Sequence, residues 1–158
     1  MKSKGTLIAV KDMETSKRFY GELLGLPVVS DFGANVVLDG RIFLQTADSW
    51  TGFIHKGADE ILFKNNAIEL YFETEDMAAF VEKLERFQGV VYVHPLLEHS
   101  WGQQVVRFYD PDFHIIEVGE KMENVVQRFL DSGLTVEETA VRMDVPADYI
   151  RACTKEEA

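Results

Sequence analysis

The stretch Gln103–Glu117, QQVVRFYDPDFHIIE, decides the fold. Residues 104–109 are rich in β-branched and aromatic side chains, which favours a strand. Asp110-Pro111-Asp112 predicts a tight turn, because proline presets φ and aspartate side chains bond to neighbouring backbone groups. A second strand is expected over His114–Val118. It places a carboxylate, that of Glu117, in an otherwise apolar run, and such a group needs a partner, a cavity or a metal ion.

The composition indicates one soluble domain in a reducing compartment. A chain of 158 residues with 46% hydrophobic residues can build a sizeable core. There is no apolar run of about 18 residues and no signal-peptide pattern, so we expect a cytoplasmic protein. The single cysteine, Cys153, excludes a disulfide within the chain. A net charge of −11 disfavours nucleic acid and anionic membranes as partners and is compatible with a neutral or cationic small molecule.

The sequence contains an internal repeat. Residues 10–25 align with residues 74–89 without a gap, so that Asp12 matches Asp76 and Gly25 matches Gly89. The aspartates are typical helix N-caps, and the glycines are typical of helix C-terminal ends. Strands are predicted before the two helices, at 6–10 and 68–73, and after them, at 27–31 and 90–94. Each half therefore predicts a β-α-β-β-β module.

These patterns predict an α+β fold in which the two βαβββ modules form a curved, partly closed mixed sheet. The modules are expected at residues 1–46 and 67–118, which together make one domain over 1–118. The connection at 47–66 is long enough to suggest a lid or a disordered loop. Alternation in the strand at 68–73 is expected to turn Glu69, Tyr71 and Glu73 away from the helix, toward a hollow that tolerates polar groups.

Residues 119–158 predict a helical extension. Met122, Val125, Val126, Phe129 and Leu130 repeat with helical spacing. Thr135–Glu138 matches a capping box that opens a second helix, and a third is expected at Asp148–Thr154. Paired short helices resemble a DNA-binding unit, but the acidic balance of this segment favours packing or dimerisation.

The paired modules, the phrase VKDMETSKRFYGELLGL at 10–26 and the ending FYDPDFHIIEV at 108–118 together resemble the vicinal oxygen chelate superfamily. This group contains glyoxalases, bleomycin-resistance proteins and extradiol dioxygenases, and the resemblance covers roughly residues 5–118. It implies a homodimer and a metal held by the first and last strands of each module. Because members differ in activity, the fold alone cannot select one.

The resemblance carries the metal-ligand positions onto Gly5 (or Thr6), Gln45, Glu69 and Glu117. The glycine and the lack of a histidine at all four positions depart from the family pattern, so no complete metal site and no cofactor are expected. If a metal does bind, Gln45, Glu69 and Glu117 are the expected ligands. Oxygen donors suit Mg²⁺ or Mn²⁺ better than zinc, and Ni²⁺ is a further candidate.

Three functions are then open. The first is a protein that binds a small organic molecule through Gln45, Trp50, Tyr71, Trp101 and Tyr109. The second is a glyoxalase-like lyase or isomerase that depends on a divalent metal, in which Glu69 or Glu117 moves a proton between carbons. The third is a ligand-sensing or assembly module that acts through the helical extension.

Three histidines lie near these positions in the sequence. His114 follows the turn and, by strand alternation, points away from Glu117, so we expect it to be structural. His94 and His99 flank the segment around Pro95–Trp101. They are expected at the surface, and contact with a bound ligand is the alternative.

Overall fold

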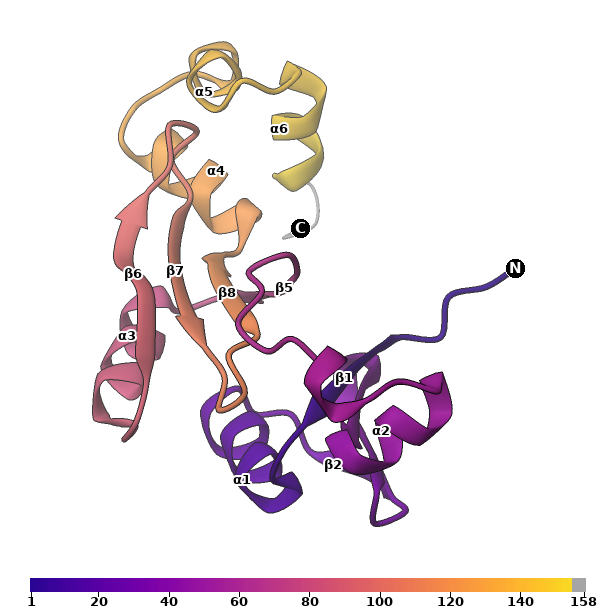
Figure 1. Ribbon diagram of the computed structural model, residues 1–158. Coiled ribbons are helices and arrows are strands. Elements are labelled where there is room, and N and C mark those ends of the chain that lie inside the picture. Colours follow the sequence, from indigo (N-terminus) through magenta and orange to yellow (C-terminus); the bar gives the residue numbers. More distant parts are fainter. Residues whose placement is uncertain (155–158) are drawn as a thin grey trace. The chain divides into compact units, whose positions relative to one another are not determined.

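The computed structural model describes residues 1–154, which form two compact units. The first unit comprises Met1–Ile68 and Tyr109–Ile115, and the second comprises Glu69–Phe108 and the chain from Ile116 onward. Each module pairs its four strands in a sheet of its own (Figure 1). The predicted α+β class, the two βαβββ modules and the C-terminal helices are confirmed. The last four residues of the predicted extension lie outside the described part of the chain.

The first unit contains the N-terminal module. Its elements are β1 (Thr6–Val10), α1 (Met13–Arg18) continued by a π-helical turn (Phe19–Leu23), β2 (Val28–Asp31), β3 (Asn35–Leu38) and β4 (Ile42–Thr46). The strand order is β1-β4-β3-β2, with β1 parallel to β4 and the other pairs antiparallel. The predicted caps are present, because Asp12 accepts a hydrogen bond from the backbone N–H of Thr15 and Gly25 has a φ of +71°.

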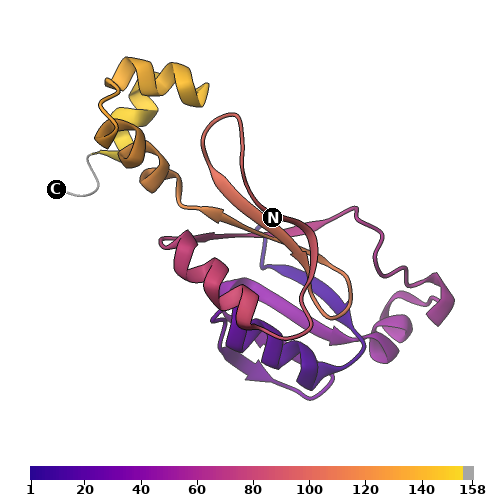
Figure 2. The same ribbon diagram turned by 90° about the vertical axis from the view of Figure 1, so that its left-hand side faces the viewer.

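Helix α1 lies across one face of this sheet (Figure 2). The buried apolar side chains of this helical segment come from the π-helical turn, and they pack with the apolar residues of the strands. Fully or almost fully buried members are Val10, Tyr20, Leu23, Val36, Leu38 and Leu44. Burial of each such aliphatic side chain contributes about 1.5–3 kcal/mol.

The connection at 47–66 contains a helix. The disordered-loop alternative is wrong for its first half, where α2 (Ala47–Ile54) follows β4 directly, and the lid stays a prediction. The hydroxyl groups of Thr46 and Ser49 bond to each other at 2.6 Å, and Ser49 also donates to the Thr46 carbonyl at 3.0 Å. These bonds hold the first turn of the helix. The chain then passes through a 3₁₀ turn (Ala58–Glu60) before the second module.

The second unit repeats the strand order of the first. Its elements are β5 (Glu69–Thr74), α3 (Met77–Arg86), β6 (Val91–Glu98), β7 (Gln104–Tyr109) and β8 (Ile115–Glu120), in the order β5-β8-β7-β6. The alternation predicted for β5 is confirmed, since Leu70 is buried and Glu69, Tyr71 and Glu73 are exposed. Strand β6 is longer than the strand expected at 90–94, because it continues to Glu98, within the segment around Pro95–Trp101.

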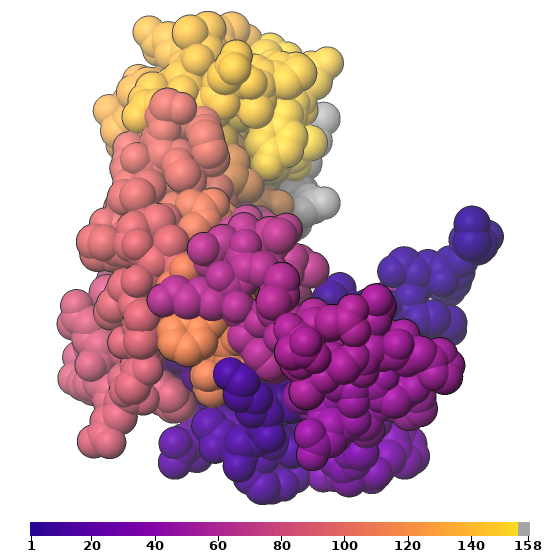
Figure 3. Space-filling model, in the orientation of Figure 1, coloured from indigo at the N-terminus to yellow at the C-terminus, as the bar shows by residue number. Residues whose placement is uncertain are grey.

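The helical extension belongs to the second unit. It consists of α4 (Met122–Asp131), α5 (Val136–Met143) and α6 (Ala147–Cys153), whose buried side chains form one cluster with Val125, Val126, Met143 and Ile150 at its centre. The helices adjoin the tip of the β6–β7 hairpin (Figure 3). No helix within residues 1–154 combines the length and the apolar character needed to cross a membrane.

A partly buried arginine joins the extension to the hairpin. Arg128 donates to the Gly102 carbonyl at 2.6 Å and to the Glu120 carboxylate at 2.9 Å. Gly102 has a φ of +93°, and a Cβ atom there would lie 2.3 Å from the Phe129 ring. The hairpin tip therefore requires glycine at this position, both for its backbone conformation and for the close approach of α4.

We expect Thr135→Ala to lower the free energy of unfolding by about 1 kcal/mol. The Thr135 hydroxyl accepts a hydrogen bond from the Glu138 backbone N–H at 3.2 Å, and the Glu138 carboxylate accepts one from the Thr135 N–H at 2.8 Å. The substitution removes the first of these bonds and weakens the capping box. Urea unfolding measures the change, with Thr51→Ala within α2 as the matched control. An equal effect of the two substitutions would contradict a special role for the cap.

Candidate functional site

One face of the second sheet gathers the predicted carboxylates. Because side chains alternate along a strand, every second residue of β5 points to this face. The other three strands of the sheet, β8, β7 and β6, contribute one residue each. We call this set the polar sheet face: Glu69, Tyr71, Glu73, His94, Arg107 and Glu117.

Arg107 is the centre of the polar sheet face. Its Nε atom lies 3.1 Å from Oε2 of Glu69, its Nη2 atom contacts Oε2 of Glu117, and its Nη1 atom lies 3.1 Å from Nε2 of His94. One guanidinium thus forms ion pairs with both glutamates that were predicted as catalytic residues and metal ligands. Its contact with Glu69 is also a charge-assisted hydrogen bond, a kind that is among the strongest in proteins.

The two glutamates differ in burial. The Glu117 side chain is 8% exposed, whereas the Glu69 side chain is 39% exposed. A buried carboxylate is stable only when it is paired, and Arg107 supplies the pairing charge for Glu117. Glu69 can exchange its bond to Arg107 for a bond to water or to a ligand at smaller cost. Of the two carboxylates, that of Glu69 is therefore the more available to bind a ligand.

Arg107 is absent from the residues predicted for the site, although the sequence contains a signal for it. The strand QVVRFY carries one charged residue among apolar and aromatic neighbours, as the following strand does with Glu117. The same physical argument, that a charge in an apolar run needs a partner, applies to both residues. The opposite charges in adjacent strands of a hairpin predict that the two side chains pair.

Tyr71 lies in a second hydrogen-bonded group next to this one. Its hydroxyl donates to Glu73 at 2.8 Å and accepts from Nε2 of Gln103 at 3.0 Å. Burial and the Glu73 carboxylate raise the pKa of Tyr71 above its ordinary value. A Cβ atom on Gly119 would lie 2.8 Å from Nε2 of Gln103, so the lack of a side chain makes room for this bond.

Trp101 borders the same group. Its indole N–H donates to Oε1 of Gln103 at 3.3 Å, and its ring stacks on His99 with centroids 4.2 Å apart. Burial and the positive charge of Arg107 lower the pKa of His99, which favours a neutral imidazole in the stack. Tyr71 and Trp101 are 48% and 37% exposed, so two aromatic rings remain accessible beside the carboxylates.

The other predicted ligand-binding residues belong to the first unit. Gln45 is buried in β4, where its Oε1 accepts from Asn35 at 2.8 Å and its Nε2 donates to Ser49. Trp50 is partly buried on α2. The Tyr109 hydroxyl donates to Asn66 at 2.8 Å. Four of the predicted site residues therefore lie in the second unit: Glu69, Tyr71, Trp101 and Glu117. The other three, Gln45, Trp50 and Tyr109, lie in the first unit.

Comparison with known proteins identifies the fold family. The sequence profile of the glyoxalase-like domain matches residues 3–123. The chain belongs to the glyoxalase-like domain family. This assignment confirms the resemblance to the vicinal oxygen chelate superfamily and leaves most of the helical extension outside the matched region. A comparison with curated proteins finds no significant match.

Solved structures with a similar fold include three bacterial proteins. A protein of unknown function from Agrobacterium tumefaciens is 34% identical, with a TM-score of 0.68 over 77% of this chain and 94% of that one. A glyoxalase-related enzyme from Fulvimarina pelagi is 20% identical, with a TM-score of 0.64 over 77% and 88%. A glyoxalase/bleomycin resistance protein/dioxygenase family enzyme from Burkholderia phytofirmans is 13% identical, with a TM-score of 0.65 over 74% and 96%. The last two share the fold.

The residues of this glyoxalase-like domain do not fit the divalent metal that its superfamily implies. Arg107 forms ion pairs with both Glu69 and Glu117, and the carboxamide oxygen of Gln45 already accepts a hydrogen bond from Asn35. At the first ligand position, a Cβ atom on Gly5 would lie 2.1 Å from the Arg41 carbonyl oxygen. Within residues 1–154, no three His, Cys, Asp or Glu side chains are grouped to hold a metal ion.

Proposed function

We propose that this glyoxalase-like protein binds a small cationic or planar organic molecule on the polar sheet face, without a divalent metal. The observation that carries the proposal is the pairing of Arg107 with both Glu69 and Glu117. A guanidinium supplies there the positive charge that a metal ion would supply in a metal-dependent relative. The same ion pairs weigh against the metal-dependent lyase or isomerase. The homodimer and the cytoplasmic location expected from the sequence stay predictions.

The charges and aromatic rings of the polar sheet face support a cation as the ligand. The face carries three carboxylates, those of Glu69, Glu73 and Glu117, and one guanidinium, that of Arg107. The excess of negative charge attracts a cation, and the exposed carboxylate of Glu69 can pair with it. The ring of Tyr71 offers a surface for stacking or for a cation–π contact, worth about 0.5–2 kcal/mol.

Fluorescence titration with 9-aminoacridine, a planar cation, tests this proposal. We expect saturable binding to the unmodified protein and an affinity about 5-fold lower for Tyr71→Ala and for Glu69→Gln, since each substitution removes about 1 kcal/mol of interaction. The planar anion 9-anthracenecarboxylate should bind more weakly than the cation to the unmodified protein, because the face carries excess negative charge.

Matched controls separate the polar sheet face from general surface effects. Phe32→Ala removes an aromatic ring that is 74% exposed in the first unit, and Glu75→Gln removes an exposed carboxylate just beyond β5. Neither substitution should change the affinity for 9-aminoacridine. The proposal fails if the cation does not bind, or if its affinity is the same in Tyr71→Ala, Glu69→Gln and the unmodified protein.

A further inference from the structure

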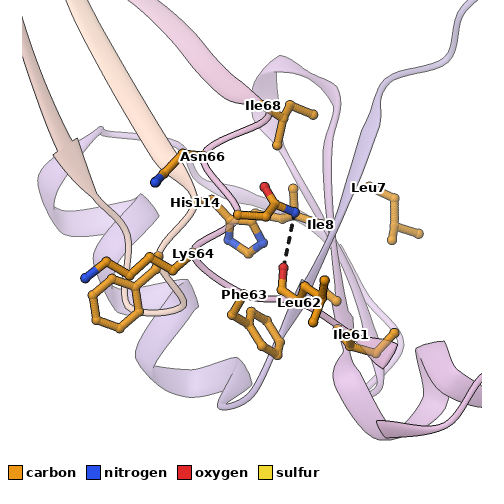
Figure 4. Close-up of a pocket in the computed structure, with 12 residues that line it drawn as sticks. Leu7, Ile8, Ile61, Leu62, Phe63, Lys64, Asn66, Ile68 and His114 are labelled. Atoms are coloured by element: carbon orange, nitrogen blue, oxygen red, sulfur yellow. Dashed lines mark hydrogen bonds between the residues drawn. The ribbon is translucent and has the colours of Figure 1, made fainter. Parts of the chain in front are cut away.

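A pocket in the first unit is separate from the residues of the polar sheet face. It has a volume of about 160 Å³ and lies between β1, the segment 61–68 and the turn at 113–114 (Figure 4). Most of its lining is apolar, with polar atoms from Lys64, two asparagines and His114. The lining residues are Leu7, Ile8, Ala9, Ile61, Leu62, Phe63, Lys64, Asn65, Asn66, Ile68, Phe113 and His114.

The loop that forms one wall of the pocket is held by specific contacts. The Asn66 carboxamide accepts a hydrogen bond from Tyr109 at 2.8 Å, and Asn65 donates to the Leu62 carbonyl at 3.1 Å. The Lys11 ammonium lies 4.2 Å from the centroid of the Phe63 ring. A wall fixed in this way makes the pocket largely preformed, as small-molecule sites usually are.

His114 places one nitrogen atom at the pocket. Its Nδ1 atom lies 2.8 Å from Oδ2 of Asp110, and the Asp110 side chain is completely buried. The carboxylate fixes the neutral imidazole in the tautomer that carries its proton on Nδ1, so Nε2 is left as a hydrogen-bond acceptor. Within residues 1–154, Nε2 has no hydrogen-bond partner, although His114 lines the pocket.

Asp110 is itself fixed by its other partners. It accepts hydrogen bonds from the Tyr20 hydroxyl at 2.8 Å and from the backbone N–H groups of Asp112 and His114 at 2.9 and 2.8 Å. The ring of Phe63 packs edge-on against the imidazole, with centroids 6.1 Å apart. The acceptor is therefore preorganised at an apolar pocket, and the predicted structural role of His114 accounts only for its Nδ1 atom.

We propose that this pocket binds a neutral, single-ring aromatic compound with one hydrogen-bond donor, and that Nε2 of His114 accepts that hydrogen bond. The volume sets the size of the ligand, because an engineered apolar cavity of about 150 Å³ holds one benzene molecule. The apolar lining favours a ring, and the unpartnered Nε2 atom of His114 favours a phenolic hydroxyl over a plain hydrocarbon. A carboxylate or phosphate group would meet the lone pair of Nε2 and is disfavoured.

Titration with phenol and with benzene tests the pocket, because the two probes differ only in the donor. We expect the unmodified protein to bind phenol about 10-fold more tightly than benzene, the equivalent of one net hydrogen bond. His114→Phe should bind the two probes equally, since it keeps an aromatic ring and removes the acceptor. The matched control is His99→Phe, in the second unit, which should keep the preference for phenol.

Nitrogen-15 NMR of the unmodified protein gives an independent readout, so the proposal can be tested even if His114→Phe does not fold. The Nε2 resonance of His114 should shift when phenol is added and stay in place when benzene is added. Failure of phenol to bind, equal affinity for phenol and benzene, or an unchanged Nε2 resonance would each overturn the proposal. None of these outcomes bears on the polar sheet face, whose probes and variants are different.

Discussion

Arg107→Met is expected to lower the free energy of unfolding by about 3 kcal/mol. Methionine keeps much of the apolar volume of the arginine but removes the charge that pairs with Glu117. The Glu117 carboxylate, 8% exposed, is then left buried without a counter-charge. Removal of one partner from a buried ion pair is costly because the remaining charge has lost its solvation and its partner together. Urea unfolding, monitored by circular dichroism, measures the change.

The double variant Arg107→Met with Glu117→Gln tests the cause of this loss. Because the unpaired charge is then absent, it should recover at least half of the stability lost in the single variant. The matched control is Arg86→Met, which breaks an ion pair with Glu82 between side chains that are 76% and 61% exposed. That change should cost less than about 0.5 kcal/mol. Equal losses in Arg107→Met and Arg86→Met would contradict the account.

Asp110→Ala is expected to cost about 3 to 4 kcal/mol, because four hydrogen bonds to a buried carboxylate are lost at once. The donors are the Tyr20 hydroxyl, the Nδ1 atom of His114 and the backbone N–H groups of Asp112 and His114. Tyr20 is fully buried, and this burial raises its pKa well above the ordinary value, with the Asp110 charge adding to the effect. Its protonated hydroxyl would have no acceptor in the variant.

Two further substitutions give losses of stability with which that of Asp110→Ala can be compared. Tyr20→Phe removes one donor and leaves the carboxylate with the other three, so we expect a smaller loss, about 1 to 1.5 kcal/mol. Asp39→Ala removes an exposed aspartate that accepts a hydrogen bond from the Gly40 N–H and should cost less than about 0.5 kcal/mol. A loss in Asp110→Ala no larger than that in Asp39→Ala would show that the buried network does not stabilise the turn.

Most of the fold could be predicted because local and global signals agree. The repeat placed Asp12 and Asp76 at corresponding positions, and each accepts a hydrogen bond from the backbone N–H three residues later. Gly25 and Gly89, which end the paired helical segments, both adopt positive φ. The helix at 47–54 could not be predicted in the same way, because its first turn depends on bonds among short hydroxyl side chains.

The candidate site could be predicted only in part. Alternation placed Glu69 and Tyr71 on one face of a strand, and the apolar surroundings of Glu117 indicated that it needs a partner. The hairpin sequence contains a signal for Arg107 as that partner, but the pairing of Arg107 with Glu69 depends on β5, which lies beside β8 although the two strands are far apart in the sequence. His114 was expected to be structural, and its Nδ1 atom fits this role, whereas the residue also lines a pocket with its second ring nitrogen unpartnered within residues 1–154.

The central claim is that an arginine side chain, and not a divalent cation, neutralises Glu69 and Glu117. Calorimetric titration of the unmodified protein with Mn²⁺, repeated with Ni²⁺, tests it most directly. We predict no saturable binding at these residues, and the same trace for Glu69→Gln and Glu117→Gln as for the unmodified protein. Binding of one equivalent of metal to the unmodified protein, lost in both variants, would contradict the claim.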